Sequence, residues 1–153
     1  MAGAFDDLYQ EVILDHYRKP RNRGPLVNPD RSVSLNNPLC GDVISIDLKL
    51  GEGKIADIHF HGQGCSISQA SASMMTTLIK GKTLADATEL ALTFKALLRG
   101  ERSFDAEGER FGDLVALQGV MKFPARIKCA TLAWNSLVLA LEGKSGQAST
   151  TEA

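Results

Sequence analysis

The sequence has little of the features that would place it in a specialised class. Aromatic residues make up only 6% of its 153 residues, and no apolar run approaches the roughly 20 residues that a membrane-spanning helix needs. The 17 basic and 18 acidic side chains are interspersed and leave a formal net charge of −1. No strong field of one sign therefore favours a polyanion or a lipid surface. We expect neither nucleic acid nor a membrane as a partner.

Cysteine is also scarce, with Cys40, Cys65 and Cys129 separated by 25 and 64 residues. The number is odd, and residues 1–7 show neither the basic start nor the apolar stretch of an export signal. A domain of this length buries roughly 68–70% of its unfolded surface and needs no disulfide to be stable. We therefore expect reduced thiols in a cytoplasmic protein.

Apolar residues at steps of three and four predict several helices. A capping box of Thr83 and Asp86 begins one helix, Gly81 ends another, and Pro124 suits the first turn of the last. The charged, glycine-bearing segment 101–112 is predicted to be a loop. The predicted helices cover residues 5–17, 66–80, 84–98, 113–118 and 124–141.

Alternating apolar and polar residues predict a small antiparallel sheet. The pattern is clean over 43–50 and 55–61, and the turn at 51–53 joins these two strands into a hairpin. Residues 31–35 are expected to add a short edge strand. His59 and His61 share one face of the hairpin, where contact with water is the commoner role than metal binding.

These elements predict one α+β domain over residues 1–143, in which a small antiparallel sheet packs against several helices. Residues 144–153 are mostly serine, threonine, glycine and glutamine, with little apolar content. Such a composition cannot bury enough surface to order itself, so we expect a disordered C-terminal tail.

Four side chains stand out as candidate metal ligands, namely Cys40, Asp42, Cys65 and Cys129. Three sulfurs and one carboxylate match what a tetrahedral zinc ion accepts, and the oxygen donor distinguishes the set from a closed four-cysteine structural site. Three widely spaced cysteines, taken alone, are equally consistent with unrelated buried thiols.

Two residues near these donors suggest chemistry. Cys40 lies in a turn between Pro38 and Gly41, so its thiol is the one expected to leave a metal and attack an incoming sulfur. Arg126 precedes Cys129 by three residues and shares its helix face. Three thiolates and one carboxylate on Zn²⁺ carry a formal charge of about −2, for which Arg126 is the candidate counter-charge.

The residues around each cysteine resemble those of a known family. The segments 37–42, 62–75 and 123–134 are similar to three blocks of the IscU/NifU-like iron-sulfur cluster assembly proteins, and specifically of the SufU branch. The resemblance runs from about Leu8 to Leu141. It implies a SufE/IscU-like α+β fold with a metal site at one end, liganded by Cys40, Asp42, Cys65 and Cys129.

For SufU-type proteins the resemblance implies a zinc-dependent sulfurtransferase. Cys40 would accept a persulfide sulfur from a pyridoxal-phosphate cysteine desulfurase of the SufS type and pass it toward downstream Suf assembly components. In IscU-type relatives the same pocket instead builds a [2Fe-2S] cluster, which is the alternative function. A purely structural zinc protein is a third alternative.

Two departures from the scaffold branch favour the transferase. Scaffold proteins carry a histidine before the last cysteine, where this chain has Lys128. The proline motif by which an Hsp70-type chaperone grips the scaffold is not matched by residues 120–125. Arg126 matches the basic residue near the SufU zinc.

Overall fold

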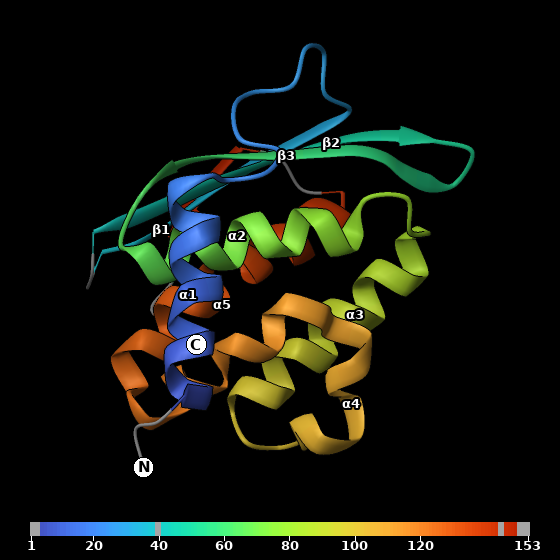
Figure 1. Cartoon of the computed structure of the whole chain (residues 1–153). Helices are drawn as coiled ribbons and strands as arrows, with labels where there is room; N and C mark the ends of the chain where they lie inside the picture. The colour runs from blue at the N-terminus through green and yellow to red at the C-terminus, as the bar shows by residue number, and fades with distance from the viewer. Residues whose placement is uncertain (1–3, 39–40, 144–145, 150–153) are drawn as a thin grey trace.

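The computed structural model describes residues 4–38, 41–143 and 146–149 of the chain (Figure 1). A twisted sheet forms one layer, and α2 and α5 run along one of its faces. This arrangement confirms the predicted α+β fold. In chain order the elements are α1 (Ala4–Arg18), β1 (Arg31–Asn37), β2 (Asp42–Gly51), β3 (Lys54–Gln63), α2 (Ser66–Ile79), α3 (Leu84–Leu98), α4 (Phe104–Phe111), the 3-10 helix η1 (Gly112–Lys122), α5 (Pro124–Leu141) and β4 (Gly146–Ser149).

The predicted hairpin is present as β2 and β3, which pair antiparallel. A bulge between Lys49 and Leu50 shifts the register near the turn, so that Ile55 is buried while Ala56 is exposed. Ala56 therefore lies on the opposite face from the one that simple alternation predicts, because one extra residue in a strand reverses the side chains that follow.

The strand order is β3-β2-β1-β4, which corrects two expectations. β1 is not an edge strand, because β4 pairs with it in parallel from Val33 opposite Gly146 to Asn36 opposite Ser149. β4 also falls within the tail predicted to be disordered, and the structure differs from that prediction over these four residues. An open strand edge offers unpaired backbone groups to any extended segment, so pairing there needs little apolar content.

Close helix packing explains the small side chains at the start of α2. Ala70, Ser71 and Ala72 are fully buried, and the Ser71 hydroxyl donates to the Ala130 carbonyl of α5 at 2.6 Å. Trp134 lies in the core, where its Nε1–H donates to Ser71 Oγ at 3.1 Å. The small residues thus bring α2 and α5 near each other under the sheet.

The loop predicted for residues 101–112 is wrong, because α4 occupies most of it. Ser103 caps this helix by accepting from the Asp105 N–H. Phe104 and Phe111 are seven residues apart, share the inner face, and both contact the Phe94 ring. Two buried aromatic anchors outweigh the polar composition of the segment. No helix among the described residues is both long and apolar enough to cross a membrane.

Candidate metal centre

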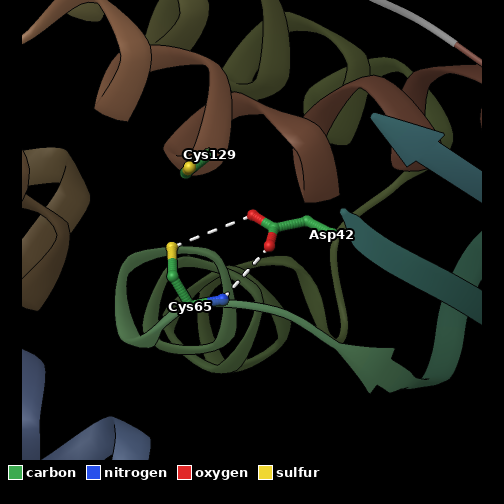
Figure 2. A group of neighbouring side chains, drawn as sticks. All are labelled: Asp42, Cys65 and Cys129. Atoms are coloured by element: carbon green, nitrogen blue, oxygen red, sulfur yellow. Dashed lines mark hydrogen bonds between the residues drawn. The ribbon is translucent and has the colours of Figure 1, made fainter. Parts of the chain in front are cut away.

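Asp42 opens β2 and points its carboxylate toward α2 rather than toward water. The residue is only 2% exposed. Its Oδ1 accepts the backbone N–H of Cys65 at 3.2 Å, and its Oδ2 lies 3.8 Å from Cys65 Sγ (Figure 2). The carboxylate therefore joins the start of the strand to the N-terminus of the helix, where free N–H groups favour negative charge.

Cys65 is the N-cap residue of α2, with an extended backbone at φ −70° and ψ 169°. Its side chain is exposed, while its sulfur faces the Asp42 carboxylate (Figure 2). A cysteine at this position has its thiolate stabilised by the helix N-terminus. The site is therefore open to solvent on the Cys65 side.

Cys129 lies in α5, across the site from α2, and is only 7% exposed. The ligand atoms of Asp42, Cys65 and Cys129 all lie within 4.8 Å of one another. For bond lengths near 2.3 Å to sulfur and 2.1 Å to oxygen, ligands on a tetrahedral zinc ion are separated by roughly 3.6 Å. The three atoms thus fit such an ion after small side-chain adjustments.

Gly64 makes room for this arrangement. A β-carbon on Gly64 would lie 2.7 Å from Asp42 Oδ1 and 2.5 Å from Ser68 Oγ, both far inside normal contact distance. The sequence analysis assigned no role to Gly64. The signal was present, since two glycines just before a candidate ligand are typical of a close approach between backbone and another group.

The other two predicted site residues, Cys40 and Arg126, are not part of the cluster that the structure describes. Cys40 lies outside the described residues, so its ligand and acceptor roles remain predictions. Arg126 is exposed, and its guanidinium carbon lies 5.7 Å from the centre of the Phe123 ring. No ion pair joins Arg126 to Asp42 among the residues that the structure describes, so its role as counter-charge also remains a prediction.

The two histidines of β3 have partners within the protein. The Nδ1 atom of His59 lies 3.1 Å from the Gly24 carbonyl oxygen, and Nε2 of His61 lies 3.6 Å from Asp47 Oδ2. Neither joins the cluster of Asp42, Cys65 and Cys129. The sequence-based preference against a metal role for these histidines stays a prediction.

The fold and the cluster define an α+β protein with a thiol and carboxylate site at one end of the sheet. Residues 8–130 match the family model described as NifU-like N terminal domain. The chain therefore belongs to the family of proteins with a NifU-like N-terminal domain, as its sequence motifs predict.

Individual relatives carry two different functional names. The zinc-dependent sulfurtransferase SufU of Bacillus subtilis is 51% identical over 132 residues, covering 86% of this chain and 88% of that protein. The iron-sulfur cluster assembly scaffold protein IscU of Streptococcus pyogenes is 47% identical over 135 residues, covering 88% and 83%.

A solved structure agrees with the fold. The crystal structure of a putative iron-sulfur cluster assembly scaffold protein for the SUF system, from Fervidobacterium islandicum, superposes with a TM-score of 0.80 at 30% identity. The match covers 91% of this chain and 99% of that one. The α+β arrangement described above is thus the fold of this family.

Proposed function

We propose that this protein is a zinc-dependent sulfurtransferase of iron-sulfur cluster assembly. In this proposal Cys40 accepts sulfur from a pyridoxal-phosphate cysteine desulfurase of the SufS type and passes it to downstream Suf components. The convergence of Asp42, Cys65 and Cys129 carries the proposal. The name of the Bacillus subtilis relative supports zinc and sulfur transfer over cluster storage.

The donor set fits zinc. Two thiols and one carboxylate provide three of four tetrahedral positions, and Cys40 precedes Asp42 by two residues, a stretch of chain that spans at most about 7 Å. We therefore expect the Cys40 thiol to complete the set. When bound, zinc would keep the cysteine sulfurs deprotonated near neutral pH, where a free cysteine is mostly protonated.

The proposed step is a thiol exchange that needs no added oxidant or reductant. The Cys40 thiolate attacks the outer sulfur of the partner's cysteine persulfide and forms a new S–S bond at Cys40. The S–S bond of the partner breaks, and its electron pair leaves on the partner's cysteine thiolate. Arg126, three residues before Cys129, would offset the negative charge at the site.

Cys40 is the proposed acceptor because the other two thiols belong to regular elements. Cys129 is buried within α5, and Cys65 is bound through its backbone to Asp42. The exposed side of Cys65 gives a partner access to the cluster. We place the activity in the cytoplasm, because reduced thiols persist in a reducing compartment.

A scaffold function is the alternative, since the Streptococcus pyogenes relative at 47% identity is named as a scaffold. A scaffold should give a stable, coloured [2Fe-2S] protein after anaerobic reconstitution. Clusters are usually held by sulfur alone, and Asp42 within the ligand set together with Lys128 in place of histidine argues against a robust one.

The direct test is to follow sulfur to a particular cysteine. The full-length protein is incubated with a SufS-type desulfurase and isotopically labelled cysteine, and peptides are analysed by mass spectrometry without reductant. We expect one additional sulfur atom on the Cys40 peptide. Cys40→Ser should abolish both this label and the stimulation of the desulfurase.

Cys65→Ser serves as the matched cysteine variant. It should lower zinc content, because Cys65 contributes a ligand, whereas the Cys40 thiol remains available for chemical labelling. Undiminished stimulation by Cys40→Ser, or label that accumulates on Cys65 in the wild-type protein, would overturn the assignment of Cys40 as the acceptor.

A further inference from the structure

A groove of about 330 Å³ lies beside the candidate metal centre. Two of its lining residues are the buried Ile67, two residues after Cys65, and the exposed Arg126, three residues before Cys129. The other walls come from α1 and η1. The same two helices that carry the ligands Cys65 and Cys129 therefore also form this groove.

The walls of the groove are held in place by hydrogen bonds between α1 and η1. Gln118 donates to the Tyr9 hydroxyl at 3.2 Å, and the buried His16 ring pairs through Nε2 with Asp113 Oδ2 at 3.0 Å. These two contacts lie seven residues apart along α1. The groove is thus formed before anything binds, which reduces the entropy cost of binding.

The lining combines apolar surface with positive charge. Ile13, Ile67 and Val120 supply apolar walls, while Lys122 and Arg126 supply the only charges among the residues that line the groove. Neither cation forms an ion pair within the described part of the chain, and residues 114–141 contain no aspartate or glutamate. This positive area contrasts with the overall net charge of −1.

Phe123 extends the groove outward. Its ring is 54% exposed and lies under the Arg126 guanidinium. Exposed aromatic rings with arginine beside them are enriched at protein interfaces, where they act as anchors surrounded by polar groups. An apolar cavity with such a rim fits a protein segment better than a free small molecule.

We propose that this groove docks the sulfur-donating protein through an acidic segment that inserts one apolar side chain. The inference rests on the proposed function, which requires a partner to bring a cysteine persulfide to the open side of the cluster. Negative charge on the segment complements Lys122 and Arg126, and the apolar side chain fills the space between Ile13 and Val120. Docking there would hold the partner within reach of the thiols.

The test measures binding of a SufS-type cysteine desulfurase to the full-length protein by titration calorimetry at low and at high salt. Lys122→Glu should weaken binding roughly tenfold at low salt, with a smaller loss at high salt, because salt screens exposed charges. Phe123→Ser should weaken binding roughly tenfold at both salt concentrations, because it removes apolar contact.

Two matched variants control for charge and for exposed apolar surface. Lys54→Glu makes the same charge reversal at the turn between β2 and β3, at the other end of those strands from the cluster. Leu92→Ser removes an apolar side chain that is 52% exposed on α3. Both should bind the desulfurase like the wild-type protein, and all four variants should keep the wild-type circular dichroism spectrum.

Measuring sulfur transfer to Cys40 distinguishes failure of the docking proposal from failure of the proposed function. At saturating protein, Lys122→Glu and Phe123→Ser should still place sulfur on Cys40, with a raised KM and an unchanged maximal rate. If both variants bind like the controls while the wild-type protein accepts sulfur, the docking surface is refuted and the proposed function stands. If the wild-type protein neither binds the desulfurase nor accepts sulfur, both fail.

A second copy of the chain is the other occupant to consider. In sedimentation experiments without the desulfurase, the wild-type protein and Phe123→Ser should have the same oligomeric state. A wild-type dimer that becomes monomeric in Phe123→Ser would assign the groove to self-association and overturn the docking proposal.

Discussion

At the scale of single residues, the missing side chain of Gly64 is as informative as the ligands themselves. The Asp42 carboxylate occupies the space that a β-carbon on Gly64 would take. Asp42 cannot simply swing away, because Oδ1 holds the Cys65 N–H and the residue is buried. Gly64 therefore positions a candidate ligand although it has no side chain of its own to bind a metal ion.

We predict that Gly64→Ala lowers zinc affinity about 10-fold to 100-fold, the usual effect of disturbing groups that orient ligands. The backbone of Gly64 does not require glycine, so the loss should come from displacement of Asp42. Competition with a chromophoric zinc chelator measures the affinity, and circular dichroism checks that the fold is retained.

Gly119→Ala is the matched control, because a β-carbon on Gly119 has no neighbour within 4 Å. It should bind zinc like the wild-type protein. In an Asp42→Ala background, Gly64→Ala should lower zinc affinity much less, because the carboxylate is gone and only the Ser68 hydroxyl remains to be displaced. If Gly64→Ala lowered zinc affinity equally with and without the Asp42 carboxylate, Gly64 would not act through Asp42.

The ligand residues show where sequence reasoning ends at this scale. Spacings of 23 residues from Asp42 to Cys65 and 64 from Cys65 to Cys129 do not themselves bring atoms together. The set was proposed because its donors suit zinc and because the surrounding motifs resemble a family. The dependence of Asp42 on Gly64 is a steric relation between distant backbones, which apolar periodicity does not report.

At the scale of secondary structure elements, segments with a clear apolar periodicity were predictable. Segments whose own sequence carries little sign of a helix or strand were not. The hairpin and the long helices α1, α2, α3 and α5 follow patterns that repeat over several turns or strand pairs. α4 was missed because its eight residues include Gly108 and several charges, while its stability comes from aromatic contacts with Phe94. β4 was missed because its pairing depends on the free edge of β1.

The exposed side of α4 gives a prediction about pH. Hydrogen bonds from Arg110 hold the pKa of Glu89 and of Glu107 below the ordinary value for a glutamate. A lowered folded-state pKa contributes stability that is present above the unfolded pKa of about 4.3 and is lost as pH falls through the folded value. The ion pairs are exposed, so the contribution is small.

We predict that Arg110→Gln lowers the melting temperature by roughly 2 °C at pH 7. The difference from the wild-type protein should shrink as pH falls below about 4.3 and disappear once both glutamates are protonated in the folded protein. Both proteins are measured by calorimetry with a metal chelator present, so that loss of metal at low pH does not enter.

Arg99→Gln is the control, because it removes a single exposed ion pair with Glu101. Its melting temperature at pH 7 should be closer to that of the wild-type protein, because it removes one exposed ion pair whereas Arg110→Gln removes two. A decrease for Arg110→Gln that persisted unchanged at pH 3 would mean that the arginine acts by packing on Phe111 and not through the two carboxylates.

At the scale of the whole molecule, the fold brings the ends of three elements to one place. Asp42 starts β2, Cys65 caps α2, and Cys129 lies near the start of α5, while the small residues of α2 let the two helices approach under the sheet. Ile67 and Arg126, close in sequence to Cys65 and Cys129, line a groove with basic and apolar walls. One end of the domain thus combines candidate metal ligands with a surface suited to a partner.

The central claim is that this end of the molecule holds zinc for sulfur transfer and does not store a cluster. The most direct measurement is elemental analysis of protein purified without added metal, together with its absorption spectrum. The account predicts about one zinc ion per chain and no visible absorption. Stoichiometric iron with the stable visible absorption of an iron-sulfur cluster would contradict it.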